Sequence, residues 1–258
     1  MTTTIYDIVN KQVASDTRWS AKVTLSDGND YFVYVDDSGF DKIADRENTV
    51  LVLAGNGPLI AKWKEWWYTS LDTSNLPETD IDGENVVNLM IVDKSNNKVL
   101  FDAGEKKALF CELSSLMLSV FAGSGDIHAA SCWSLNRCVN TAIESASVLD
   151  YFTSSVVRYV DFTNGNTNIS KMDYNYSSIV NAIMDRGFIM NLSESTAAND
   201  VGTPLNQHQI KEEINALFTT GNAVASAPVP GMSTFKWSNK NKEKLITAIN
   251  KVKELENI

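Results

Sequence analysis

Short stretches of strand-forming residues, separated by tight polar turns, follow one another through the first 162 residues of the chain. Residues 2–16 contain two such stretches on either side of Asn10-Lys11, so we expect the chain to start with a hairpin. A second hairpin is predicted around the turn at 26–29, because the segment 31–35 after it is aromatic and β-branched. Strands joined by such turns pair antiparallel, so the pattern favours mainly antiparallel sheets.

Helices interrupt this pattern at two places before residue 162. A buried strand at 50–53 ends at Gly55-Asn56-Gly57, and Pro58 after it suits the first position of a helix. That helix has apolar residues at helical spacing, which we interpret as core positions: Leu59, Ile60, Trp63, Trp66 and Trp67. The remaining predicted elements are a polar loop at 69–84, a hairpin of 86–92 with 99–102, a strand at 116–122, a helix at 127–150 with a break near Asn136, and a strand at 156–162.

The segment 166–258 is predicted to be a helical extension of a core formed by residues 1–165. Three stretches in it, 177–188, 207–218 and 243–256, have an apolar stripe at helical spacing. Each stripe has to be buried, so we expect these helices to pack on the core as a layer or subdomain of the same chain. Pro228 and Pro230 mark residues 223–231 as a linker.

Composition excludes several classes of function. The net charge of −10 argues against nucleic-acid binding, which needs a basic surface. No apolar run is long enough to cross a bilayer and the N-terminus lacks a signal-peptide pattern, so we expect no membrane association and a cytoplasmic location. Two separated histidines, His128 and His208, and the absence of a Cys-x-x-Cys pair argue against a zinc site, and we expect no cofactor. Three cysteines fit reduced thiols: Cys111, Cys132 and Cys138.

Six short motifs follow one another in an order that changes the interpretation of their residues. Taken singly, Thr2-Thr3-Thr4 would be an N-terminal tail, and Asp16 and Lys42 would be surface charges. The motifs are Thr2-Thr3-Thr4-Ile5, Ala14-Ser15-Asp16-Thr17-Arg18, Asp41-Lys42-Ile43, Leu53-Ala54-Gly55, Gly123-Ser124-Gly125 and Asp150-Tyr151-Phe152-Thr153-Ser154-Ser155. As an ordered set, they resemble the motif series of proteasome β subunits and their bacterial ATP-dependent relatives, which are N-terminal-nucleophile (Ntn) hydrolases.

The resemblance covers about residues 2–162 and implies a fold and a catalytic group. The implied fold is α+β, a four-layer αββα sandwich of two mainly antiparallel sheets, here with the helical extension added. The implied nucleophile is the hydroxyl of Thr2 after removal of Met1, because a free α-amine on the same residue can take the hydroxyl proton. The reference pKa of such an amine, about 7.7 to 8.0, leaves a useful neutral fraction near pH 7.

The remaining motif residues receive supporting roles from the same resemblance. The Lys42 ammonium would favour the neutral amine and the developing alkoxide, and Asp16 would pair with Lys42 and hold it in place. The backbone N–H of Gly55 would be the oxyanion donor, a group worth about 2.7 to 4 kcal/mol in other hydrolases. A hydrogen-bonded patch would orient the amine, and its members would be Ser124, Asp150 and Thr153. On this interpretation Lys42→Ala would reduce turnover with little change in melting temperature.

Three functions are compatible with the sequence. The first is a threonine hydrolase, in particular a peptidase, acting on a peptide or protein substrate. The second is a catalytically inactive relative that uses the fold to bind a protein partner, and the third is an amidase acting on small amides. Because the polar stretch at 69–84 is too short for a long helix of the ring-forming relatives, we expect a monomer or small homo-oligomer rather than a double ring.

Overall fold

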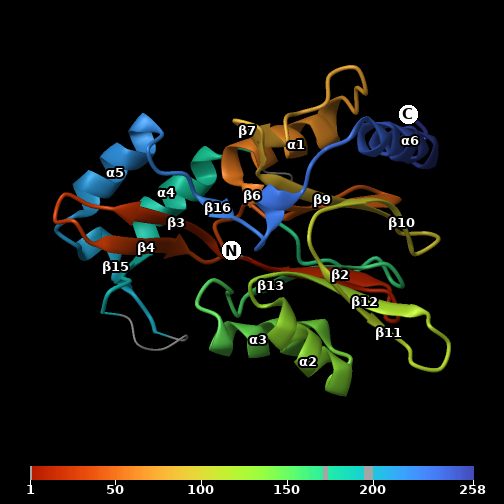
Figure 1. The fold of residues 1–258 in the computed structure, drawn as a ribbon, viewed down its shortest axis with the longest axis horizontal. Helices are drawn as coiled ribbons and strands as arrows, with labels where there is room; N and C mark the ends of the chain where they lie inside the picture. Colours follow the sequence, from red (N-terminus) through yellow and green to blue (C-terminus); the bar gives the residue numbers. More distant parts are fainter. Residues whose placement is uncertain (1, 171–173, 195–199) are drawn as a thin grey trace.

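The computed structural model describes residues 2–170, 174–194 and 200–258. Two sheets pack face to face, and helices cover the outer face of each, so the chain is a mixed α+β sandwich (Figure 1). Within the described residues there are six α-helices, and all the strand pairings between named strands are antiparallel. The predicted α+β class with antiparallel sheets is therefore confirmed.

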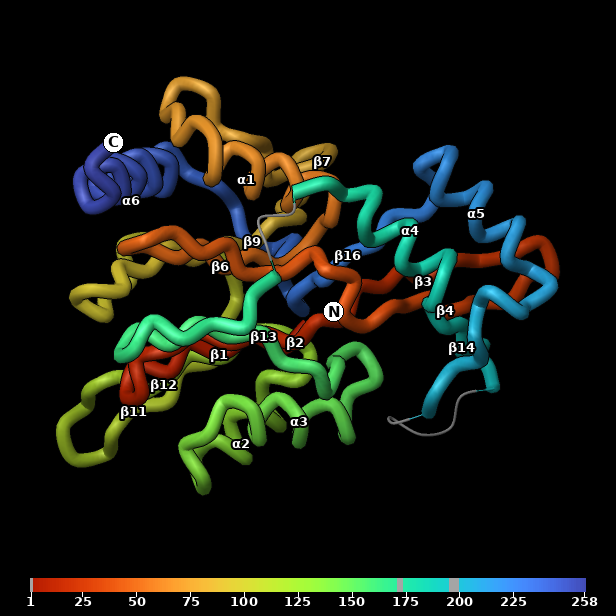
Figure 2. Tube along the Cα trace, turned by 180° about the vertical axis from the view of Figure 1, so that it is seen from behind, coloured from red at the N-terminus to blue at the C-terminus, as the bar shows by residue number. Residues whose placement is uncertain are grey.

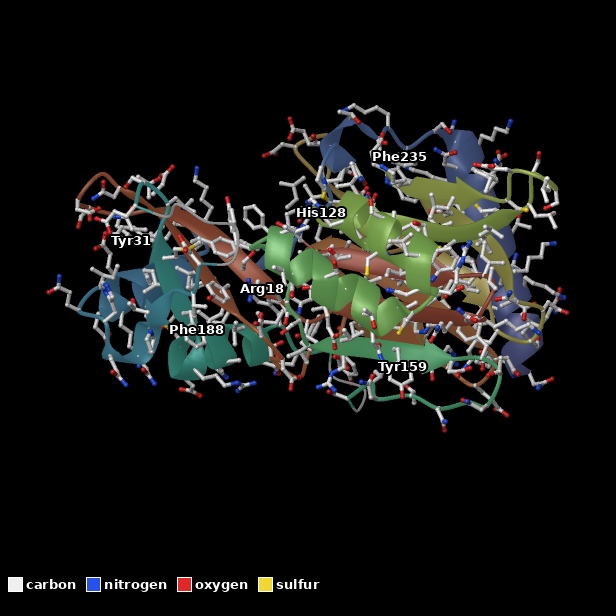
Figure 3. All side chains as sticks on the ribbon, turned by 90° about the horizontal axis from the view of Figure 1, so that it is seen from below. Arg18, Tyr31, His128, Tyr159, Phe188 and Phe235 are labelled. Atoms are coloured by element: carbon white, nitrogen blue, oxygen red, sulfur yellow. The ribbon has the colours of Figure 1, made fainter. Side chains whose placement is uncertain are left out.

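The smaller sheet has five strands and contains the N-terminal hairpin. Its strands, in spatial order, are β11 (Lys107–Phe110), β12 (Met117–Gly123), β1 (Thr3–Asp7), β2 (Gln12–Asp16) and β13 (Val157–Asp161). Two helices, α2 (Asp126–Asn136) and α3 (Val139–Leu149), lie over the outer face of this sheet (Figure 3). They correspond to the predicted helix at 127–150 and its break.

The larger sheet has nine strands and is assembled from distant parts of the chain. Its spatial order is β10 (Lys98–Ala103), β9 (Val87–Asp93), β6 (Thr49–Asn56), β16 (Ser226–Ala227), β3 (Trp19–Thr24), β4 (Asp30–Val35), β14 (Phe188–Asn191) and β15 (Thr203–Pro204), and β5 (Ile43–Asp45) also pairs with β6. A separate small ribbon pairs β7 (Asp80–Ile81) with β8 (Glu84–Asn85). Among the strands of the described residues, β16 alone lies between β6 and β3 and pairs with both.

Alternating side chains along the strands divide the core into layers. In β1, Ile5 packs under α2 and α3, whereas Tyr6 faces the interior between the two sheets. In β6, Val52 faces that same interior, whereas Leu51 and Leu53 pack on the outer side with the other helices. Period-two burial on both sheets thus produces the layered arrangement in Figure 1.

Four helices share the outer face of the larger sheet. They are α1 (Gly57–Thr69), α4 (Ser177–Arg186), α5 (Lys211–Thr220) and α6 (Asn239–Glu256), and the tube in Figure 2 shows them along the side of that sheet opposite α2 and α3. Asn56 caps α1 by accepting a hydrogen bond from the N–H of Leu59. The buried stripes of α4, α5 and α6 join the cluster that contains the α1 tryptophans. None of the helices in the described ranges is long and apolar enough to cross a bilayer.

The segment 166–258 differs from the expectation that it is purely helical. It also supplies three strands, β14, β15 and β16, to the larger sheet. These strands were missed because β15 and β16 have two residues each and β14 follows directly after α4, so none leaves a period-two signal long enough to detect. Four further short strands, β5, β7, β8 and β11, were missed for the same reason.

Candidate active site

Three predicted site residues, Thr2, Asp16 and Lys42, meet at the N-terminal end of the smaller sheet. The hairpin register pairs Thr4 with Ser15, so Asp16 at the end of β2 lies beside Thr3, at the start of β1. Lys42 precedes β5 on the larger sheet, where its carbonyl accepts a hydrogen bond from the N–H of Leu53. The contact between these side chains therefore joins the two sheets.

The three side chains form a closed set of hydrogen bonds. The Lys42 ammonium donates to the Thr2 hydroxyl at 2.9 Å and to Asp16 Oδ1 at 2.8 Å. The Thr2 hydroxyl in turn donates to the same Asp16 oxygen at 2.7 Å. The other carboxylate oxygen of Asp16 accepts from the backbone N–H groups of Arg18, at 2.9 Å, and Ser154, at 3.1 Å. The backbone thereby holds the Asp16 carboxylate in place, and the carboxylate in turn positions the side chains of Thr2 and Lys42.

Burial and charge set the ionisation of the Asp16–Lys42 pair. Both side chains are fully excluded from solvent. Burial opposes ionisation of Asp16, but the Lys42 charge and the hydrogen bonds from Lys42, Thr2 and Thr3 outweigh it and hold the pKa of this carboxyl below its usual value. Burial also lowers the pKa of the Lys42 ammonium, against the opposing effect of Asp16. Lys42 is therefore an ammonium that gives up its proton more readily than an exposed lysine.

Gly55 lies near the end of β6, where the strand passes into α1. Its φ of +125° belongs to the region that favours glycine, and a Cβ atom there would lie 2.0 Å from the carbonyl oxygen of Val86. The predicted turn from strand to helix is therefore present, and it requires glycine. Gly55 is two residues beyond Leu53, whose N–H contacts Lys42, so it lies on the same stretch of β6 as the lysine contact.

Ser124, Asp150 and Thr153 form the second predicted cluster. Asp150 Oδ2 accepts hydrogen bonds from the hydroxyls of Ser124, at 2.5 Å, and Thr153, at 2.7 Å. The cluster connects to the N-terminal strand through Thr153 and the hydroxyl of Thr3, whose oxygens are 2.7 Å apart. The structure thus brings the three residues together, but the contact described with the N-terminal strand goes to Thr3 rather than to Thr2.

Residues outside the predicted set also hold the site together. The N–H groups of Thr3 and Ser154 bind Asp16, and Arg18 forms an ion pair with Asp36 while its guanidinium lies 4.1 Å from the centre of the Tyr34 ring. These contacts depend on which loops meet in space, and backbone donors leave no signal in the identity of a residue. Arg18 belongs to the second of the six motifs, but nothing in the sequence identifies Asp36 as its partner.

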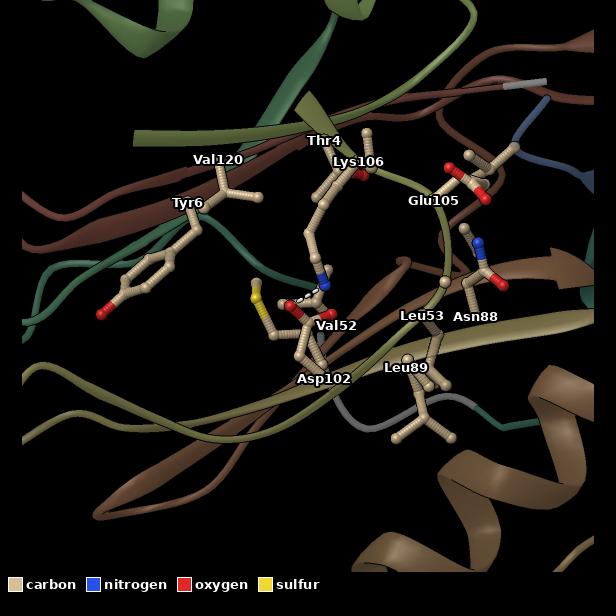
Figure 4. Close-up of a pocket in the computed structure, with 16 residues that line it drawn as sticks. Thr4, Tyr6, Val52, Leu53, Asn88, Leu89, Asp102, Glu105, Lys106 and Val120 are labelled. Atoms are coloured by element: carbon tan, nitrogen blue, oxygen red, sulfur yellow. Dashed lines mark ion pairs between the residues drawn. The ribbon is translucent and has the colours of Figure 1, made fainter. Parts of the chain in front are cut away.

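Thr2 is inaccessible to solvent in this structure, with 0% of its surface exposed. Met1 lies outside the described residues, so its predicted removal stays a prediction. A pocket opens two residues along β1, at Thr4, and Figure 4 shows the Val52 and Val120 side chains facing into it from the two sheets; Met90 also lines it. Asp102 and Lys106 form an ion pair at this pocket, and burial lowers the pKa of Lys106 to about 8.

A comparison of the chain with protein-family models found no match, and a comparison with curated proteins found none either. Within the described ranges, no group of three or more histidine, cysteine or acidic side chains is placed to hold a metal ion. The arrangement at Thr2 is therefore interpreted from its own chemistry. It is a hydroxyl held between a buried ammonium and a buried carboxylate.

Proposed function

We propose that the chain is a threonine hydrolase of the N-terminal-nucleophile type, in which removal of Met1 makes Thr2 the nucleophile. The observation that supports this most directly is the 2.9 Å hydrogen bond from the buried Lys42 ammonium to the Thr2 hydroxyl. Asp16 accepts a hydrogen bond from each of these two groups. A hydroxyl needs a base and a nearby positive charge to attack a carbonyl, and this arrangement provides the charge at the oxygen that would attack. The proposed fold is the four-layer Ntn-hydrolase sandwich.

The proposed reaction is hydrolysis of a peptide or other amide bond in two steps. The freed amine of Thr2 takes the hydroxyl proton as Oγ1 bonds to the carbonyl carbon, and the proton passes to the leaving nitrogen as the C–N bond breaks. Water then cleaves the resulting ester and restores the hydroxyl. Lys42 would stabilise the negative charge that develops on Oγ1, and the N–H of Gly55 would stabilise the charge on the substrate oxygen.

The ionisation states favour this assignment of roles. Asp16 stays ionised because its pKa is lowered, so it keeps the Lys42 ammonium oriented toward Thr2. Ser124, Asp150 and Thr153 would order the start of β1 through Thr3 and so position the amine of Thr2. The alternative, a catalytically inactive protein-binding relative, predicts no amide hydrolysis, whether or not Met1 is removed.

The decisive experiment combines mass measurement with two variants at one position. Protein purified from a bacterial cytosol is analysed by intact-mass spectrometry and assayed on fluorogenic tetrapeptide amides with small, apolar, basic or acidic terminal residues. We expect loss of Met1, activity on at least one peptide, retention of activity in Thr2→Ser and loss of activity in Thr2→Ala. Full retention of Met1 in an active protein would overturn the nucleophile assignment.

A further inference from the structure

The strand β16 fills a gap in the larger sheet with a distant segment of the same chain. Ser226 pairs with Ser20 of β3 on one side and with Asn56 of β6 on the other, and Ala227 pairs with Gly55. Without these two residues, β3 and β6 would face each other as two open strand edges. Such edges bind extended peptides by adding a strand, with main-chain hydrogen bonds giving affinity.

The segment around β16 is shaped like a bound peptide. From residue 223 to residue 229, buried positions alternate with half-buried ones, and the buried members are Ala223, Ala225, Ala227 and Val229. This period of two means that an extended chain turns every second side chain into the protein. Ala225 and Ala227 have no exposed surface, so the positions that receive them accept only small side chains.

The backbone at Gly57 lies close against this segment and binds it. The N–H of Gly57 donates to the carbonyl of Ala225 at 3.2 Å, and a Cβ atom on Gly57 would lie 2.4 Å from that oxygen. The N–H of Ala225 donates to the hydroxyl of Tyr176 at 2.8 Å. The segment is therefore held by main-chain contacts, which do not depend on its sequence, and by close approach at a glycine.

The segment also reaches the elements that carry the candidate site. Val229 and Met232 pack with Ala54, the neighbour of Gly55, and with Ala122. Gly123, next to Ala122, lies so close to Thr2 that a Cβ atom on it would meet the Thr2 carbonyl oxygen at 1.6 Å. Val229 also lines the pocket that opens at Thr4, so this pocket can receive an apolar side chain of an extended peptide.

We propose that residues 223–230 are a tethered occupant of a peptide-binding slot between β3 and β6, beside Thr2. The slot takes an extended peptide with small residues at two alternate positions and an apolar residue two positions later. While its own segment fills it, the chain cannot place another peptide along Gly55, so the uncut chain cleaves a peptide only when the segment leaves the slot, and more slowly than the emptied chain does. The inference deepens the proposed function and rests on it for the catalytic consequence, but the slot itself is tested by binding.

The test empties the slot without altering its walls. Cleavage sequences for a site-specific protease are inserted after Gly221 and after Gly231, both exposed, in the full-length chain. After cleavage of the native protein, dialysis removes the released piece, and a fluorescein-labelled synthetic peptide with the sequence of residues 222–231 is added. Fluorescence anisotropy measures its binding, and circular dichroism checks that the cut protein remains folded.

We expect the labelled peptide to bind, and a peptide carrying Ala227→Glu to bind at least about 100-fold more weakly, because that change puts an unpaired charge in a fully buried position. A peptide carrying Asn222→Glu, with the same charge at an exposed position, should bind like the parent. The proposal is overturned if the cut chain unfolds, if the released piece never exchanges with the labelled peptide, or if the two glutamate peptides bind equally well.

Hydrolysis measured on the same samples separates this inference from the proposed function. If the emptied chain binds the peptide but cleaves no amide, the slot stands and the threonine-hydrolase proposal fails. If the uncut chain already cleaves peptides as fast as the emptied chain, the hydrolase stands and the closing role of the segment fails.

Discussion

Lys42 and Asp16 form an ion pair at 2.8 Å in which neither side chain has any exposed surface. An ion pair in such a position contributes little net stability by itself, but loss of one partner leaves an uncompensated charge in the interior. The pair therefore couples the proposed chemistry to the stability of the fold. The sheets of the sandwich meet at this contact, because Asp16 belongs to the smaller sheet and Lys42 borders the larger one.

Replacement of Lys42 by alanine should therefore affect both turnover and stability. We expect turnover to fall by at least about 10²-fold, the effect of losing an electrostatic group at the attacking oxygen. We also expect the free energy of unfolding to fall by about 3 to 5 kcal/mol, because Asp16 is left buried without its partner. The sequence-based expectation of little change in melting temperature is thus revised, because Lys42 is buried, with 1% of the whole residue exposed.

Lys64 provides the matched control for this variant. It is also buried, at 2% exposure, but its ammonium donates to the carbonyl of Asp41 and lies over the Phe40 ring, and neither of these contacts involves Thr2. Lys64→Met should lower stability without changing turnover per folded molecule. Equal turnover in Lys42→Ala and wild-type protein, both assayed below their melting temperatures, would contradict the role assigned to Lys42.

Asp16→Asn should reveal the lowered pKa of this carboxyl through the pH dependence of stability. A carboxyl whose pKa is lower in the folded state binds fewer protons there than in the unfolded chain. Its contribution to the stability of the fold is therefore complete above its pKa in the unfolded chain, which is about 3.9. The contribution is lost as the pH falls through the lowered folded value. We therefore expect wild type and Asp16→Asn to differ in their free energies of unfolding, measured by denaturant titration. This difference should be constant near neutral pH and should shrink below about pH 4.

The control for this titration is Asp82→Asn, an exposed position in the turn between β7 and β8. The free energy of unfolding of this variant should differ from that of wild type by less than about 0.5 kcal/mol at each pH measured. A difference in the free energy of unfolding between wild type and Asp16→Asn that grows as the pH falls toward 4 and is level below it would mean that the Asp16 pKa is raised rather than lowered.

Gly55→Ala tests whether the strand-to-helix turn needs glycine. The substitution would place a Cβ atom 2.0 Å from the Val86 carbonyl oxygen at a φ of +125°, so we expect it to cost more than the roughly 1 to 3 kcal/mol of backbone strain alone. Gly28→Ala is the matched control, because Gly28 also has a positive φ, of +81°, but nothing lies within 4 Å of its would-be Cβ. If chemical denaturation shows that both variants lose the same free energy of unfolding, the close contact at Gly55 is contradicted.

The hairpins, the strand-to-helix turn at Gly55 and the broken helix after Gly125 could be predicted because each has a local cause. Period-two alternation, a turn with glycine and a proline at the start of a helix act over a few residues, and these elements are present close to the expected positions. The meeting of Thr2, Asp16 and Lys42 was predicted in another way, from the order of six motifs. Their hydrogen bonds bring these three side chains together, while their chemical roles stay predictions.

Residues 223–231 contain a strand, β16, that could not be predicted from the sequence. Two prolines indicate a linker, and the short apolar alternation around Ala225 and Ala227 is interrupted by Pro228. The strand partners of Ser226 and Ala227 are Ser20 and Gly55, about 200 and 170 residues earlier in the chain, so only the folded structure reveals the strand. The same limit applies to Ser154, whose contact with Asp16 is made by a backbone N–H.

The last prediction concerns assembly. The stripes of α4, α5 and α6 are buried in the same chain, where Ile183, Ile214 and Ile249 each have 0% exposure, so these helices keep no apolar face for ring contacts. The polar segment after α1, which holds only β7 and β8 and their loops, adds no further helix to that layer. We therefore expect a monomer or small homo-oligomer of the 28.5 kDa chain. Light scattering at micromolar concentration measures this directly, and a mass of about twelve chains or more would mean that a ring forms through surfaces other than these helices.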